Sequence, residues 1–290
     1  MSMITTCKLS TLLILLAILV PLSSVQAIES QQVYGHLFLS TSADINNKSP
    51  LIFIMGGSEG GDDFASENAQ RFLDHGYHVV SIGYFGMEGT PEHLNRISLD
   101  SIHRLIMRYK NHQRVDPNRI AILGVSKGGE LALLFASLYK EIRAIIAAVP
   151  SHVSFQASNI TLFSNSSWEL DDQEIVFVPY QRLSIATIKG ILTGEYLDMH
   201  IQALENTKAV EAAKIRVENS TAAILLISGQ QDQIWPSTYM SNEIMKRLAK
   251  HNYPYPYEHY QMNADHFVLD HPESWKKIMS FLDNNIQATK

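Results

Sequence analysis

Short apolar runs, each closed by turn residues, recur through the first half of the chain. They are continuous rather than alternating, which is typical of strands buried on both faces. The segments between them have apolar residues at helical spacing. Strands that alternate with helices predict an α/β fold with a doubly wound, mostly parallel sheet. The predicted buried strands are 51–55, 77–82, 119–123 and 143–149, and the predicted helices are 62–75, 91–110 and 130–136.

The regular pattern breaks after the fourth buried strand and resumes at residue 222. We expect residues 151–218 to form a lid or substrate-shaping insertion over the carboxyl edge of the sheet. No linker or repeat divides residues 28–290, so one domain is the economical interpretation. Residues 33–39 alternate weakly and predict an edge strand. The second half then predicts a strand at 222–228, a helix at 237–251, a strand at 257–262 and a closing helix at 272–285.

The first 27 residues have the pattern of a secretory signal. Lys8 precedes an apolar run from Leu12 to Val20, and Val25-Gln26-Ala27 resembles a cleavage site. The run is short for a bilayer span, although an uncleaved anchor is the alternative. We expect cleavage after Ala27, no stable membrane span afterwards, and a periplasmic or secreted protein. Cys7 is the only cysteine of the chain, so the mature protein would have no thiol nucleophile.

The composition of the chain argues against several classes of function. The chain has 290 residues, 46% hydrophobic residues and a formal charge of −6, which suits one large domain. It has no basic block, which argues against nucleic-acid binding. It also lacks an H-E-x-x-H motif and a cysteine cluster, so we expect neither a metal nor a cofactor. The oligomeric state is left open.

A Gly-x-Ser-x-Gly motif, with Ser126 at its centre, joins the third buried strand to a helix. In such an elbow the serine backbone is strained, and the flanking Gly124 and Gly128 avoid clashes. Gly129 would let the helix pack close to the strand. The serine also lies at a helix N-terminus, where negative charge is favoured. We interpret Ser126 as a nucleophile; a helix N-cap is the alternative.

Two later loops supply the partners that a serine nucleophile needs. Asp232 follows the strand at 222–228, and His266 follows the strand at 257–262. Both therefore lie at the carboxyl edge of the predicted sheet, in the order Ser, Asp, His of α/β-hydrolases. We predict that His266 is the base and Asp232 its orienting acid. His152, just after the fourth buried strand, is the one rival base near this edge.

Backbone N–H groups should stabilise the oxyanion. We predict one donor at Lys127, after the nucleophile, and another at Gly57 or Ser58, in the glycine-rich loop after the first buried strand. A phosphate cradle is the alternative for this loop, but no Walker lysine follows it. We expect the Lys127 side chain to face solvent and Glu130 to cap the elbow helix.

The motif segments resemble a known family. The run from Gly124 to Leu133 closely resembles the nucleophile segment of the acyl-CoA thioesterases related to bile acid-CoA:amino acid N-acyltransferase. The run from Ile224 to Asp232, with Trp235, is similar to that family's acid segment, and Asp265-His266-Phe267 stands where the family has its histidine. The resemblance extends from about Leu51 to the C-terminus. It implies an α/β-hydrolase fold, a Ser126–Asp232–His266 triad and thioester or amide acyl chemistry.

This chain differs from the family that it resembles in two ways that bear on its function. The family has an N-terminal β-sandwich domain, for which the segment before Leu51 is too short. The amino-acid-conjugating branch uses a cysteine nucleophile, so Ser126 favours hydrolysis. We therefore expect a serine hydrolase of a small ester or thioester acyl substrate. An acyltransferase to an amine or amino acid and a non-catalytic binding protein of the same fold are the alternatives.

Overall fold

The computed structural model describes residues 32–42, 47–157, 164–181 and 183–286. The predicted signal at 1–27 lies outside the described residues. Within them, no helix is both long enough and apolar enough to cross a bilayer.

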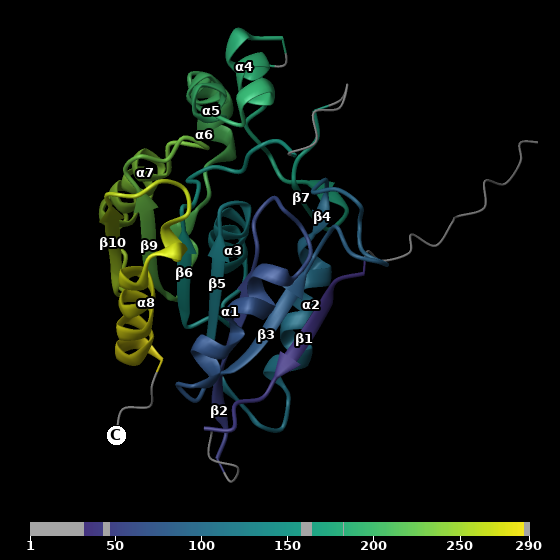
Figure 1. Cartoon of the computed structure of the whole chain (residues 1–290), viewed down its shortest axis with the longest axis vertical. Helices are drawn as coiled ribbons and strands as arrows, with labels where there is room; N and C mark the ends of the chain where they lie inside the picture. Colours follow the sequence, from purple (N-terminus) through teal and green to yellow (C-terminus); the bar gives the residue numbers. More distant parts are fainter. Residues whose placement is uncertain (1–31, 43–46, 158–163, 182, 287–290) are drawn as a thin grey trace, which may run out of the picture. The chain divides into compact units, whose positions relative to one another are not determined.

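A central sheet of seven strands organises the described residues (Figure 1). Its order is β1-β3-β2-β5-β6-β9-β10. Only β1 runs antiparallel, as the edge neighbour of β3, and the other pairs are parallel. The predicted α/β-hydrolase sheet is thereby confirmed. The strands are β1 (Tyr34–Phe38), β2 (Ser49–Met55), β3 (His78–Gly83), β5 (Val115–Val125), β6 (Ala144–Ala148), β9 (Ala223–Gly229) and β10 (Tyr257–Met262).

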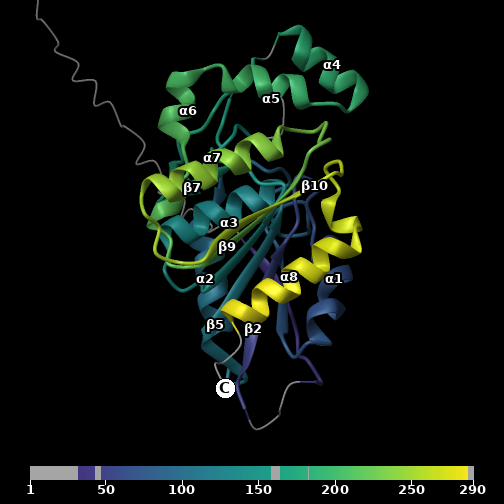
Figure 2. The ribbon, with the colours of Figure 1, turned by 90° about the vertical axis from the view of Figure 1, so that its left-hand side faces the viewer.

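Helices cover both faces of this sheet, as Figure 2 shows. One face packs against α1 (Asp63–Leu73) and α8 (Pro272–Asn285), and the other against α2 (Leu99–Lys110), α3 (Lys127–Leu138) and α7 (Ser237–Lys250). The side chains of β2 alternate between the two cores, with Phe53 in one and Ile54 in the other. Burial on both faces explains why this strand reads as a continuous apolar run.

The helix predicted at 91–110 is shorter than expected. Residues 92–96 form bends, and α2 begins at Leu99. The Ser98 side chain accepts a hydrogen bond from the Ser101 N–H at 3.2 Å, which is an N-cap. Ser98 itself belongs to β4 (Ile97–Ser98), which pairs with a strand of the insertion. A capping serine and a distant strand partner thus set the start of this helix.

The segment between β6 and β9 adds a second, smaller structure. Its strands extend β4 into a sheet of order β4-β7-β8, and its helices lie beyond one end of the central sheet in Figures 1 and 2. These elements are β7 (Trp168–Leu170), β8 (Gln173–Glu174), α4 (Ile185–Thr193), α5 (Leu197–Leu204), α6 (Thr207–Ala213) and the 3-10 turn η1 (Val217–Asn219); a second such turn, η2 (Val268–Asp270), precedes α8.

Candidate active site

The turn between β5 and α3 holds Ser126 in a strained backbone conformation. Its φ is 56° and its ψ −118°, which is a sparsely populated region for a residue with a side chain. A Cβ atom at Gly124 would lie 2.0 Å from the Gly128 carbonyl oxygen, and one at Gly128 would lie 2.2 Å from that of Gly56. The two glycines are therefore required by close backbone approach, as the motif predicts.

Backbone hydrogen bonds connect the loop after β9 to the loop after β10. The N–H groups of Gln230 and Gln231 donate to the carbonyls of Met262 and Ala264, both at 2.9 Å. A Cβ atom at Gly229 would lie 2.0 Å from the Asp265 carbonyl oxygen. This contact brings the loop of Asp232 against the loop of His266, because the parallel strands that precede them end side by side.

These connections bring the three predicted side chains together. His266 Nε2 lies 3.0 Å from Ser126 Oγ, and His266 Nδ1 lies 2.9 Å from Asp232 Oδ2. An ionised carboxylate only accepts hydrogen bonds, so Nδ1 carries the proton. Nε2 is then the acceptor for the Ser126 hydroxyl, which is the arrangement that general-base activation of a serine needs.

Asp232 is itself held in place. Its side chain is 2% exposed, and its Oδ1 atom accepts hydrogen bonds from the N–H groups of Ile234 at 2.9 Å and Trp235 at 3.2 Å. The Trp235 indole donates to the Val149 carbonyl at 3.0 Å, just after β6. The carboxylate therefore has one oxygen fixed by backbone donors and the other directed at the imidazole.

The glycine-rich loop after β2 reaches the nucleophile. A Cβ atom at Gly57 would lie 3.0 Å from Ser126 Cβ. The Gly57 N–H, however, donates to the carboxylate of Glu59 at 2.7 Å, so this predicted oxyanion donor is engaged. Ser58 lines the cavity at Ser126, and Lys127 is the first residue of α3. Sequence reasoning missed the contact from Glu59, whose side chain folds back two residues.

A cavity of about 210 Å³ opens at Ser126. Its walls come from four places: the glycine-rich loop after β2, the elbow, the loop after β9, and the insertion. The insertion contributes aromatic and apolar side chains that no sequence motif marks. The lining residues are Ser58, Ser126, Lys127, Tyr180, Tyr196, Met199, His200, Ile234 and Trp235.

The side chain of Lys127 does not face solvent, which corrects the expectation from sequence. It is 4% exposed, and its ammonium lies 2.7 Å from Glu130 Oε1. The same oxygen accepts hydrogen bonds from the Trp168 indole at 2.7 Å and from the Phe155 N–H at 3.2 Å. Glu130 thus joins α3 to the insertion rather than capping the helix. The i,i+3 spacing of Lys and Glu was the only local signal for this pair.

Burial opposes both charges of this pair. It lowers the pKa of Lys127 and raises that of Glu130, while their mutual attraction opposes each shift. The close ion pair and three donors on one oxygen favour the charged forms. The two charges compensate each other, and Lys127 lines the cavity that opens at Ser126.

A neutral histidine of α5 forms part of the cavity wall. His200 Nδ1 lies 2.9 Å from the Tyr196 carbonyl, to which it must donate, so His200 Nε2 accepts from the Tyr180 hydroxyl at 3.2 Å. Burial lowers the pKa of His200 to about 4. Among the aromatic residues of the insertion, Phe155 and Trp168 are buried in packed clusters, and Phe163 lies outside the described residues.

The rival histidine, His152, is not directed at Ser126. It lines a different cavity and packs edge-on against Tyr239. His266 is therefore the imidazole that reaches the nucleophile.

Comparison with known proteins identifies the family of this chain. Residues 106–272 match the sequence model of the family described as "BAAT / Acyl-CoA thioester hydrolase C terminal". This match spans more than half of the chain and contains all three residues of the Ser–His–Asp cluster. The chain belongs to this family. The family resemblance predicted from the motif segments is confirmed.

Individual relatives and solved structures are also similar to this chain. Acyl-coenzyme A thioesterase 1 of Rattus norvegicus is 28% identical over 200 residues, which cover 69% of this chain and 44% of the relative. Its Homo sapiens counterpart is 25% identical over 226 residues, covering 78% and 50%. The chain thus spans about half the length of these relatives. An acylaminoacyl peptidase of Pyrococcus horikoshii has the same fold, with a TM-score of 0.60 and 14% identity, over 91% of this chain and 43% of the peptidase.

Proposed function

We propose that this protein hydrolyses a small acyl thioester or ester through an acyl-Ser126 intermediate. The observation that carries the proposal is the Ser126–His266–Asp232 hydrogen-bonded chain at a cavity, in a strained elbow. Acyl thioester chemistry is supported by the family and by the thioesterase relatives.

The proposed reaction has two stages. Ser126 Oγ attacks the acyl carbon while His266 Nε2 takes the hydroxyl proton, and the imidazolium formed is stabilised by Asp232. His266 then returns the proton to the leaving sulfur or oxygen as its bond to carbon breaks. Water attacks the acyl-serine, with His266 again as base, and the carboxylic acid leaves.

The oxyanion of each stage would be stabilised by backbone donors. We propose the Lys127 N–H and one N–H of Gly57 or Ser58 for this role. Because Glu59 engages the Gly57 N–H, Gly57 can serve only when that carboxylate moves away. The helix dipole of α3 adds to the stabilisation of negative charge at Ser126.

The cavity favours a short acyl group. Its volume of about 210 Å³ is somewhat larger than a cavity that holds benzene, about 150 Å³. The aromatic walls from Tyr180, Tyr196 and Trp235 suit an apolar chain. We expect turnover to be fastest with acyl chains of roughly six to eight carbons and to fall for longer ones.

A fluorophosphonate probe with intact-mass readout tests the nucleophile directly. The wild type should gain one adduct, located on Ser126 by peptide mapping, and Ser126→Ala should gain none. Absence of an adduct on the wild type, or equal labelling of the variant, would refute the mechanism. Thioester and p-nitrophenyl ester panels then define the acyl group, and product analysis with added amines separates hydrolysis from transfer.

We also propose that the protein is exported and cleaved after Ala27, on the signal pattern of the sequence alone. N-terminal sequencing of the mature protein from the exported fraction would read from Ile28 if this is correct. A protein retained in the cytoplasm with an intact leader would contradict it.

A further inference from the structure

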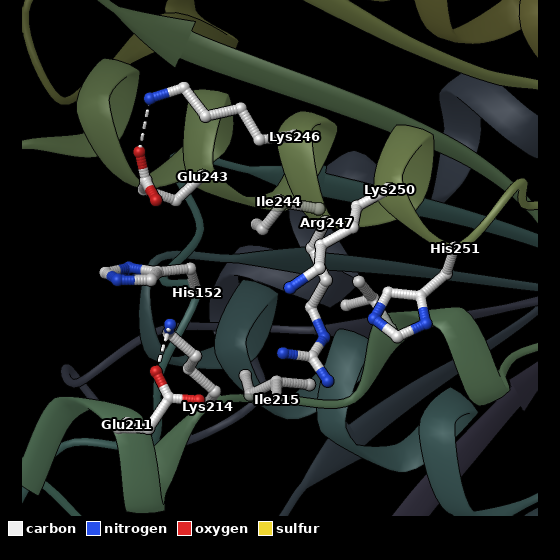
Figure 3. A pocket seen from close by; sticks show the side chains of 11 residues that line it. His152, Glu211, Lys214, Ile215, Glu243, Ile244, Lys246, Arg247, Lys250 and His251 are labelled. Carbon is white, nitrogen blue, oxygen red and sulfur yellow. Dashed lines mark hydrogen bonds and ion pairs between the residues drawn. The ribbon is translucent and has the colours of Figure 1, made fainter.

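A second cavity, of about 200 Å³, lies between α7 and the segment that follows α6 (Figure 3). Among the described residues it shares no lining side chain with the cavity at Ser126. Lys246, Arg247 and Lys250 line it from one face of α7, at helical spacing. Lys214 lines it from the opposite wall, and Ile215 and Ile244 form an apolar base.

The cationic side chains at this cavity outnumber the carboxylates that pair with them. Lys214 pairs with Glu211 at 2.5 Å, and Lys246 pairs with Glu243 at 2.6 Å. Arg247 binds Glu218, a carboxylate behind the cavity wall. The Lys250 ammonium forms no hydrogen bond or ion pair with any described residue. Four cations therefore meet three carboxylates in a chain whose net charge is −6.

The paired lysines are available to a ligand. The side chains of Lys246 and Glu211 are both 72% exposed, and exposed ion pairs contribute little to stability. Either ammonium can turn toward an anion at small cost, whereas Arg247 is held at the cavity by Glu218, whose side chain is only 12% exposed. In Figure 3 the side chains of Arg247 and Lys250 point from α7 toward the wall that carries Lys214 and Ile215.

A buried histidine lines the same cavity. His152 is 5% exposed, and its Nδ1 atom has no hydrogen-bond partner among the described residues. A buried imidazole nitrogen without a partner is unfavourable, so a ligand oxygen within reach would stabilise the site. Burial also lowers the pKa of His152 to about 4, which leaves the ring neutral near pH 7.

We propose that this cavity binds a small molecule through its phosphate group. Convergent ammonium groups and a planar guanidinium match the charge and geometry of a phosphate. The volume accommodates a phosphate together with part of the group that carries it. A metal ion is disfavoured, because the carboxylates are already paired with cations and the described residues contain no group of three metal-ligating side chains. The inference does not depend on the proposed hydrolysis, because the two cavities are separate.

Binding can be measured without catalysis. The full-length Ser126→Ala protein is titrated with inorganic phosphate and with free coenzyme A by isothermal titration calorimetry. At least one probe should bind, more weakly as salt rises. The Lys250→Gln change should weaken binding about tenfold, the loss of one charge-assisted hydrogen bond. Lys208→Gln is the matched control, because Lys208 is exposed on α6 outside the cavity and its loss should leave the affinity unchanged.

Lys250 is exposed, so its replacement should not disturb folding, which a thermal melt verifies. The proposal is overturned if neither probe binds, or if Lys250→Gln and Lys208→Gln change the affinity equally. Kinetics of the Lys250→Gln protein with intact Ser126 identify the source of the phosphate. A higher KM for a coenzyme A thioester, but not for the same acyl group on N-acetylcysteamine, assigns the phosphate to the substrate. Lost binding with both KM values unchanged assigns it to a separate ligand.

Discussion

Among the described residues, two hydrogen bonds join a serine hydroxyl to a histidine ring, one at the elbow after β5 and one between β9 and β10. His266 Nε2 is 3.0 Å from Ser126 Oγ, and His259 Nε2 is 2.7 Å from Ser228 Oγ. By the serine–histidine distance alone, the second pair is the tighter one. Ser228 lies at the end of β9 and His259 within β10, so the pair is formed between neighbouring strands rather than between loops.

The two pairs differ in what surrounds them. His266 Nδ1 faces the Asp232 carboxylate, whereas His259 Nδ1 faces the amide oxygen of Asn242 at 3.2 Å. Ser126 opens onto a cavity, whereas Ser228 is fully buried and also contacts Thr238 at 3.0 Å. Burial lowers the pKa of His259 to about 4. Under the proposed mechanism, a hydrogen-bonded serine and histidine are not enough for hydrolysis, which also needs a carboxylate to orient the histidine and a cavity that admits the substrate.

The largest expected difference between the two pairs is in the effect on kcat/KM of removing the hydroxyl of Ser126 or of Ser228. We expect Ser126→Ala to lower kcat/KM for a short acyl thioester by about 10⁴-fold or more, because the nucleophile is lost. Ser228→Ala should change it by less than about threefold, since that residue contacts no reacting atom. Steady-state kinetics on both variants measure this. Comparable losses would mean that the second pair also serves the reaction.

The role of the Asp232 carboxylate can be tested by changing the residues that face Nδ1 of the two histidines: Asp232 at His266 and Asn242 at His259. Asp232→Asn should lower kcat by about 10³- to 10⁴-fold, because the amide no longer fixes the required tautomer or stabilises the imidazolium. Asn242→Asp gives His259 a carboxylate, yet it should create no activity in the Ser126→Ala background, because Ser228 stays buried. Hydrolysis by Ser126→Ala/Asn242→Asp would show that burial is not what keeps the second pair inactive.

The Lys127–Glu130 ion pair, which directly follows Ser126 in the sequence, is buried. Glu130→Gln leaves the Lys127 ammonium without its buried counter-charge, and we expect the free energy of unfolding to fall by about 3 kcal/mol. Urea unfolding measures this change. Glu243→Gln, which breaks an exposed pair of the same i,i+3 spacing, should leave the unfolding midpoint unchanged. Equal midpoints for the two variants would contradict the structural role of Glu130.

We expect the Ser228–His259 pair to contribute to the free energy of unfolding near neutral pH and to lose this contribution in acid. The folded pKa of His259, about 4, lies below the unfolded value of 6.5, so the unfolded state binds the proton more readily. This contribution is present above pH 6.5 and is lost as the pH falls toward 4. Because the ring is only partly buried, we expect about 1 kcal/mol. Urea unfolding from pH 7 to 4.5 should show a shallower decline for His259→Gln, and an unchanged slope would contradict the pKa shift.

The sequence placed the parts of the site that depend on local pattern. The elbow around Ser126 needs glycines at fixed offsets, and both backbone clashes are found at those glycines. Asp232 and His266 were located by the strands that precede them, because parallel strands end at a common edge. No comparable pattern marks the insertion, where apolar spacing is irregular and neither Tyr180 nor His200 stands in a motif.

The positions that sequence reasoning missed depend on distant contacts. Lys127 was expected in solvent, but it is buried because Glu130 and Trp168, which are 38 residues apart, meet beside it. The start of α2 was misplaced because Ser98 pairs with β7 across the insertion. Such contacts leave no signal in the spacing of neighbouring residues.

The amino-acid sequence by itself determined the order along the chain of the strands in the central sheet and of the helices that cover it, the family, and the identity of a serine, an aspartate and a histidine at one edge of a parallel sheet. These follow from periodicity and turn chemistry, which act over a few residues. The tertiary structure alone decided which histidine reaches which serine, what buries Lys127, and where the two cavities lie. Those features depend on how side chains from distant segments share space, and only the folded chain specifies that.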